Sequence, residues 1–138
     1  MRVDPYLYFQ GRCEEALEFY GRALGAEVQA LVRFGEMPGA QAPVANRDKV
    51  MHAVLRIGET TVLASDGQHR GMTSFDGFGM ALTAPSDAEA ERLFAALAEG
   101  GQVQMPLAAT PFASRYGMLA DRFGVPWMVV SQAQPGQG

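Results

Sequence analysis

The alternation of apolar and polar positions predicts two units of the same kind along this chain. In the first unit, strands are predicted at residues 5–9, 27–34, 51–57 and 60–65, with a helix after the first strand. In the second, strands are predicted at residues 78–84, 102–108, 114–120 and 126–131, again with a helix after the first. The predicted order is therefore β-α-β-β-β, a polar linker, and β-α-β-β-β again, which indicates an internal duplication.

Both helices are predicted from apolar stripes at helical spacing. The stripe of the first helix consists of Cys13, Ala16, Leu17, Tyr20 and Leu24. Gly25 is expected to end this helix. The second helix begins at a capping box, and its start signals and stripe are Ser86, Glu89, Ala90, Leu93, Phe94 and Leu97. Each stripe predicts a helix that buries one side against its own sheet.

A four-stranded sheet that carries a single helix has one face that this helix does not cover. Two such sheets can curl towards each other and leave a cup, the concave and mostly apolar kind of place where ligands bind. The predicted fold class is therefore α+β, with two paired βαβββ modules that form a curved mixed sheet around a cup. The predicted boundaries are module 1 at about residues 1–66, a linker at 67–77, module 2 at about 78–133, and a flexible tail at 134–138.

The composition excludes several classes of protein. The chain has 138 residues, of which 48% are hydrophobic and 19% charged, so it has enough apolar material for a core and is not a disordered chain. Its net charge of −4 argues against nucleic-acid binding, which needs a basic surface. The single cysteine excludes an internal disulfide and fits a reducing compartment. Without a secretion signal or a run of 18 apolar residues, a soluble cytoplasmic protein with no membrane partner is expected.

Three stretches carry a family resemblance. YLYFQGRCEEALEFYGRALGAEV (6–28), RFGEMPG (33–39) and RDKVMHAVLRIGETTVLASD (47–66) resemble the PhnB-like branch of the vicinal oxygen chelate superfamily. That superfamily includes glyoxalase I, bleomycin-resistance proteins and extradiol dioxygenases. The resemblance implies a single glyoxalase-like domain over residues 1–133, assembled as a homodimer with cups at or near the subunit contact.

The resemblance also implies where a metal would be held in metal-using relatives. There, four His, Glu or Gln ligands come from equivalent strands of the two modules, and those places fall on Pro5, Leu63, Gly79 and Met128 in this chain. None of these residues is a ligand for a hard cation, and the positions beside them are no better. The four-ligand metal site is therefore expected to be absent, and no cofactor is predicted. A divalent metal recruited differently, through His52, is the alternative left open.

Strand parity and the family register give five candidate ligand-binding residues. In MHAVLRI (51–57), alternation places Ala53 and Leu55 in the core and turns His52 towards the cup, where a group that titrates near neutral pH is useful. Leu7 and Phe9 are expected in the cup wall, which would turn Tyr8 towards the helix. A cup-facing Arg115 would clamp a carboxylate or phosphate. The predicted ligand-binding residues are thus Phe9, His52, Leu63, Arg115 and Met128, and His52 is also the only candidate catalytic residue.

Other conspicuous residues have structural interpretations. Cys13 lies on the apolar stripe of its helix and is expected to be buried rather than nucleophilic. His69 lies in a polar loop and is expected to be solvated, and Trp127 is expected to lie in the core. GFGMAL (77–82) precedes a strand and lacks a third glycine, so it is no dinucleotide fingerprint. Because no glycine-rich loop for a methyl donor occurs, a methyltransferase activity is rejected.

Three functions remain open from the sequence. The first is a non-metal protein that binds a small, partly apolar molecule in a dimer cup, as bleomycin-resistance proteins sequester drugs. The second is a lyase or isomerase that acts on a carbonyl compound, with His52 as acid or base or as a non-standard metal ligand. The third is a structural or regulatory partner in which the loop at residues 35–48 meets another protein. Small-molecule binding is favoured, because apolar residues stand at the former ligand places.

Overall fold

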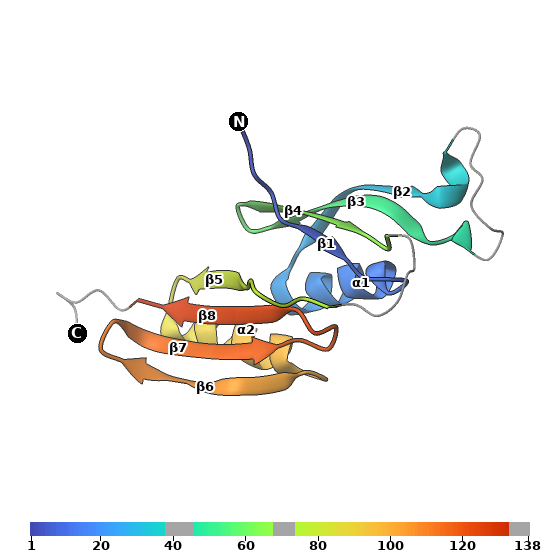
Figure 1. Cartoon of the computed structure of the whole chain (residues 1–138). Helices are drawn as coiled ribbons and strands as arrows, with labels where there is room; N and C mark the ends of the chain where they lie inside the picture. The colour runs from blue at the N-terminus through green and yellow to red at the C-terminus, as the bar shows by residue number, and fades with distance from the viewer. Residues whose placement is uncertain (38–45, 68–73, 133–138) are drawn as a thin grey trace. The chain divides into compact units, whose positions relative to one another are not determined.

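The computed structural model describes residues 1–37, 46–67 and 74–132 (Figure 1). The chain divides into two compact units, Met1–Thr73 and Ser74–Gly138, and the described residues of each form one α-helix and one four-stranded sheet. Within each unit the elements follow the order strand, helix, strand, strand, strand. The predicted α+β fold of two βαβββ modules is therefore confirmed.

Unit 1 is a mixed sheet with the strand order β1-β4-β3-β2. Its elements are β1 (Tyr6–Tyr8), α1 (Cys13–Leu24), β2 (Glu27–Arg33), β3 (Val50–Ile57) and β4 (Thr60–Ser65). Strand β1 runs parallel to β4, and the other pairs are antiparallel. A short 3-10 helix, η1 (Phe34–Glu36), follows β2 at the start of the predicted loop. Most of that loop, residues 38–45, lies outside the described residues.

Unit 2 repeats this topology with the strand order β5-β8-β7-β6. Its elements are β5 (Met80–Ala84), α2 (Asp87–Ala98), β6 (Gln102–Thr110), β7 (Ala113–Ala120) and β8 (Pro126–Ser131). Strand β5 runs parallel to β8, and the other pairs are antiparallel. The two units thus share both element order and strand pairing, which supports the duplication inferred from the sequence.

The helix ends follow the predicted local chemistry. Gly25 caps α1 in the left-handed region at φ 71°, a conformation that costs glycine little because it has no Cβ. At the start of α2, the Ser86 side chain accepts a hydrogen bond from the backbone N–H of Glu89 at 3.1 Å, as the capping box predicts. The predicted apolar stripe of α2 is buried in full: Ala90, Leu93, Phe94 and Leu97.

One face of each sheet packs against the helix of its own unit. In unit 1, the paired residues Leu7, Ala64 and Ala53 form a row that is at most 3% exposed. In unit 2, Val129 is fully buried, and its partner Gly117 lies so close to α2 that an added Cβ would stand 2.8 Å from the Phe94 ring. Since side chains alternate along a strand, these contacts fix which residues lie on the other face of each sheet.

A buried carboxylate joins three segments of unit 1. Asp66, 1% exposed, accepts backbone hydrogen bonds from Gly11 at 2.8 Å, Cys13 at 2.7 Å and Val50 at 2.8 Å. These bonds connect the end of β4 to the start of α1 and the start of β3. In unit 2, Asp121 accepts backbone bonds from Phe123 and Val125 and a bond from the indole N–H of Trp127 at 2.9 Å. Buried charges of this kind are tolerated because backbone donors replace water.

We expect Asp66→Asn to destabilise the protein by about 3 kcal/mol, because the amide keeps one acceptor oxygen and turns an NH₂ group towards a backbone donor. Thermal unfolding followed by circular dichroism should show a midpoint roughly 10 °C lower than that of the parent. Glu59→Gln, at an exposed position of the β3–β4 turn, is the matched control and should leave the midpoint unchanged. Equal midpoints for the two variants would contradict the anchoring role of Asp66.

Candidate functional site: the open faces of the two sheets

The sheet face of unit 1 that points away from α1 carries an apolar stretch with one hydrogen-bonded polar pair, and at its far end the charged Arg56, which pairs across the strands with Thr61 and Glu27. Residues that pair across neighbouring strands point to the same side of a sheet. Tyr6 pairs with Leu63, Leu63 with Val54, and His52 with Val32. We call this set the open face of unit 1: Tyr6, Tyr8, Val32, His52, Val54 and Leu63. Its members are half-buried, apart from Tyr8, which is 50% exposed.

The polar pair on this face is Tyr6 and His52. The Tyr6 hydroxyl oxygen lies 2.8 Å from Nδ1 of His52, although the two residues are 46 positions apart in the sequence. The Tyr6 ring also stacks on Tyr8, with ring centroids 4.9 Å apart and an interplanar angle of 19°. An imidazole, a phenol and a second aromatic ring are therefore held together at one end of the sheet face.

The environment of Tyr6 keeps its phenol protonated. Burial raises the pKa of Tyr6 above its ordinary value, the neighbouring Tyr8 and Cys13 raise it further, and a hydrogen bond with Ser65 opposes the change. A phenol with a raised pKa carries its proton at neutral pH, so it can donate to the imidazole nitrogen.

The structure places three of the five predicted ligand-binding residues on open faces. His52 and Leu63 lie on the open face of unit 1 as described, and Met128 lies on the corresponding face of unit 2. Whether any of them contacts a ligand stays a prediction.

The prediction of which β1 residues face the helix is wrong by one residue. Phe9 is 2% exposed and lies on the helix side, with its ring centroid 6.3 Å from that of Tyr20 in α1. Tyr8, predicted to face the helix, is on the open face instead. The physical reason is that the fully apolar Leu7 and Phe9 gain more from burial than tyrosines, which keep a polar hydroxyl near water. This difference between the side chains is present in the sequence and indicates the correct orientation of β1.

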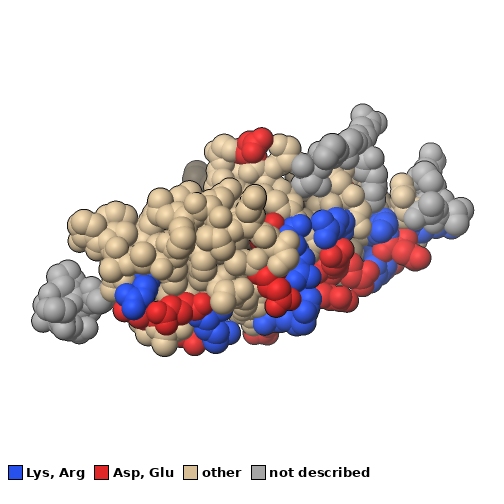
Figure 2. Space-filling view, turned by 90° about the horizontal axis from the view of Figure 1, so that it is seen from below, with Lys and Arg blue, Asp and Glu red and all other residues tan. Residues whose placement is uncertain are grey.

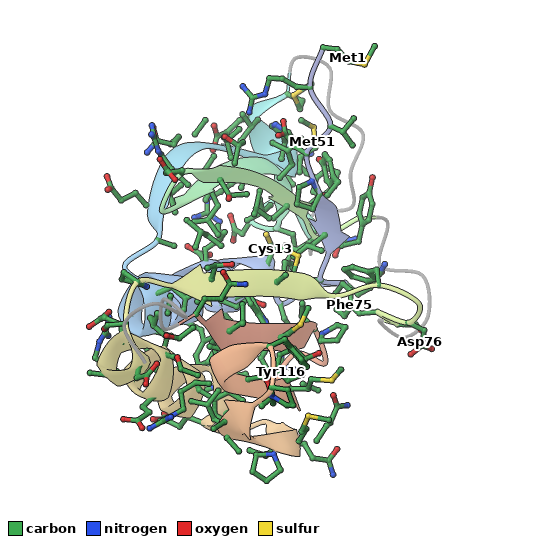
Figure 3. All side chains as sticks on the ribbon, turned by 90° about the vertical axis from the view of Figure 1, so that its left-hand side faces the viewer. Met1, Cys13, Met51, Phe75, Asp76 and Tyr116 are labelled. Atoms are coloured by element: carbon green, nitrogen blue, oxygen red, sulfur yellow. The ribbon has the colours of Figure 1, made fainter. Side chains whose placement is uncertain are left out.

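The open face of unit 2 is uncharged along two complete rows of paired residues. One row joins Ala81, Met128, Met118 and Met105, and the other joins Thr83, Val130, Tyr116 and Ala108. Phe112 extends the face, with its ring edge-on to Tyr116 at a centroid distance of 5.1 Å. Figure 3 shows sulfur-bearing side chains along this sheet on the side away from α2. We call this set, with Phe112, the open face of unit 2.

The predicted cup-facing orientation of Arg115 is wrong. Arg115 pairs across the strands with Ser131, which is 2% exposed, and its guanidinium makes ion pairs with Asp87 at 3.5 Å and Glu91 at 3.3 Å, both in α2. Arg115 is therefore committed to its own helix, and Tyr116 takes the position on the open face. Gly117 explains why this face of β7 packs on the helix, because its lack of a side chain lets Phe94 of α2 approach the strand.

The places that hold metal ligands in metal-using relatives carry no suitable donors here. Leu63 lies between Tyr6 and Val54, and Met128 lies between Ala81 and Met118. Within residues 1–37, 46–67 and 74–132, no three His, Cys, Asp or Glu side chains are grouped so that they could hold a metal ion. Leu63 and Met128 have no oxygen or nitrogen donor in their side chains, and the absence of a metal stays a prediction. His69 lies outside the described residues.

Cys13 and Trp127 are structural, as predicted. Cys13 is fully buried, and Figure 3 shows it between the helix and the sheet of unit 1. Burial, followed by the nearby charges of Asp66 and Glu14, raises the pKa of the Cys13 thiol to about 12. Trp127 is 4% exposed and donates its indole N–H to Asp121.

Comparison with known proteins identifies the class to which this architecture belongs. The family model of the Glyoxalase/Bleomycin resistance protein/Dioxygenase superfamily matches residues 2–129. The chain therefore belongs to this superfamily.

Particular relatives narrow the assignment to the PhnB-like branch. Protein YjdN of Escherichia coli K12 is 37% identical over 147 residues, which cover 99% of this chain and 100% of YjdN. The crystal structure of PA1353 from Pseudomonas aeruginosa is 44% identical, with a TM-score of 0.86 over 97% of this chain and 99% of PA1353. The PhnB protein from Bacillus cereus is 25% identical, with a TM-score of 0.79 over 95% of this chain and 99% of that protein.

Charges of both signs lie on the face shown in Figure 2, and the two described α-helices are short. Figure 2 shows basic and acidic side chains next to one another on the face it presents. In the described part of the chain, both α1 and α2 have 12 residues, and neither has the length and apolar character to cross a membrane.

We expect the Cys13 thiol to be unreactive in the folded protein. With a pKa raised to about 12, the folded thiol stays protonated at about pH 8, whereas an unfolded thiol ionises near its ordinary pKa of about 8.5. The folded state therefore loses stability only as the pH rises above the ordinary thiol pKa towards the raised one. Reaction with 5,5′-dithiobis(2-nitrobenzoate) should be about 100-fold slower in native protein than in denaturant. Rapid labelling of the native protein would refute this environment.

Proposed function

We propose that this protein binds a small, partly apolar molecule on the open faces of its sheets, without a hard metal ion. The observation that carries the proposal is the open face of unit 2, whose two rows of paired residues include no charged side chain. Its methionines can adjust to ligands of different shape, because the thioether chain is unbranched and polarisable. Tyr116 and Phe112 add flat aromatic area, which small-molecule sites commonly use.

The positions of the charged groups support the same function. Arg115, which would have favoured an anionic ligand, is paired with Asp87 and Glu91 on the helix side. The hydroxyls of Ser114 and Ser131 also bond Asp87 and lower its pKa. With these charges directed to α2, a neutral, partly apolar molecule matches the open face better than a highly charged one.

Binding should be visible at the methionines of unit 2. We expect ethylbenzene and acetophenone, used as probes, to shift the ¹³C-methyl resonances of Met118 and Met128 in a concentration-dependent way. Met80, which pairs with Trp127 on the helix side, is the internal control and should shift less. Met128→Lys should weaken probe binding about 10-fold, because it places a charge in the apolar row. The probe affinities should be the same after EDTA treatment.

Ala95→Lys is the matched control for that substitution. It adds the same charge at an exposed position of α2, away from the open face, and should bind the probes like the parent. If no probe shifts Met118 or Met128, or if the two lysine variants bind equally well, the proposed function fails. Loss of binding on EDTA treatment would contradict its metal-free character.

We also propose that the protein works as a homodimer in the cytoplasm. The dimer is supported by the membership of the superfamily and by large apolar side chains outside the open faces that a lone chain exposes, including Val28 at 47% and Val103 at 46%. Light scattering coupled to size exclusion should give twice the mass of the 138-residue chain at micromolar concentration. A stable monomer under those conditions would contradict the proposal.

A further inference from the structure

We infer that Tyr6 is a positioning residue that holds the proton of the His52 imidazole on Nε2, and that this N–H donor makes the open face of unit 1 selective for planar ligands that carry a carbonyl oxygen. The selectivity rests on the proposed function, because it concerns the kind of small molecule that the open faces take. The positioning of His52 by Tyr6 is a property of the chain itself and does not need a ligand.

The chemistry of the two side chains favours one direction for the hydrogen bond between them. The Tyr6 oxygen is 2.8 Å from Nδ1 of His52. A neutral phenol is a stronger hydrogen-bond donor than an imidazole N–H, and an imidazole nitrogen is the stronger acceptor, so we assign the Tyr6 O–H as donor and Nδ1 as acceptor. A neutral imidazole whose Nδ1 is an acceptor carries its proton on Nε2. Half-buried His52 therefore offers one N–H donor to a ligand.

Tyr8 supplies an aromatic surface next to this donor. Its ring stacks on Tyr6, and the residue remains 50% exposed. Gly67, where φ is +65°, lies beside this ring, because a Cβ built there would stand 3.2 Å from Cδ1 of Tyr8. Aromatic rings prefer offset-stacked or edge-on partners, so an exposed ring favours a planar ligand.

The rest of the open face decides the polarity of that ligand. Leu63 pairs across the strands with Tyr6 and with Val54, so two apolar side chains lie next to Tyr6 on this face. A ligand must therefore be largely apolar and satisfy one N–H donor with an acceptor, which an aryl carbonyl compound does. Because a neutral N–H compensates the desolvation of a full negative charge poorly, a neutral ketone should be preferred over a carboxylate of the same size.

The test compares three probes of nearly equal size: acetophenone, benzoate and ethylbenzene. Long-range ¹H–¹⁵N spectra of histidine-labelled protein at about pH 8, where an ordinary imidazole is neutral, report the tautomer of His52 directly. We expect the Nε2–H tautomer in the parent protein and in Tyr8→Phe, and a mixture of tautomers in Tyr6→Phe. Acetophenone should shift the His52 Nε2 resonance and bind about 10-fold more tightly than ethylbenzene and benzoate, a preference that Tyr6→Phe reduces.

Tyr8→Phe is the matched control, because it removes a phenol oxygen from the same cluster without touching the bond to His52. A His52 that carries its proton on Nδ1, or that is unchanged by Tyr6→Phe, overturns the inference. Equal affinity for acetophenone and ethylbenzene overturns the selectivity. If no probe shifts any methionine methyl while the tautomer depends on Tyr6, the proposed function fails and the positioning role of Tyr6 stands.

Discussion

The packing of each helix on one face of its own sheet is the constraint on which the rest of this structure depends. It buries Leu7, Ala64 and Ala53 in unit 1 and Val129 in unit 2. Because successive side chains of a strand point to opposite faces, the neighbours of these residues along each strand must lie on the face away from the helix. A shift of one residue along a strand would exchange the two faces completely. The open faces, and every chemical property argued for them, are consequences of where α1 and α2 find their apolar partners.

Much of the fold could be predicted from the sequence because its signals are local. The apolar stripe of α2, the Ser86 cap, Gly25 and the order of the strands each depend on neighbouring residues. The site residues depend on which side of each strand faces the helix. In a short strand the two sides have similar apolar content, so the sequence hardly distinguishes them. The predicted orientations of Phe9 and Arg115 are wrong for this reason. The deciding contacts, Phe9 with Tyr20 and Arg115 with Asp87, join residues that are distant in the sequence.

The two open faces have different chemistry although they come from the same topology. Unit 2 presents thioethers and aromatic rings in uncharged rows, which suits adaptable apolar contact. Unit 1 adds one hydrogen-bonded pair, Tyr6 with His52, to an apolar stretch. A duplicated fold has thus kept its packing in both halves, and the difference between the halves lies in the side chains that packing leaves uncovered. Membership of a superfamily with many activities does not choose among functions, so the function of this chain depends on these side chains.

Side-chain nuclear Overhauser effects across β1 measure which face of this strand packs on α1, because they report the neighbours of each alternate residue. We expect contacts from the Tyr6 ring to the Leu63 methyl groups and to the His52 ring, and contacts from the Phe9 ring to Tyr20 of α1. Contacts from the Tyr6 ring to Tyr20, with Phe9 next to His52, would show the strand in the opposite orientation. That result would place the polar pair under the helix and contradict the assignment of the open face.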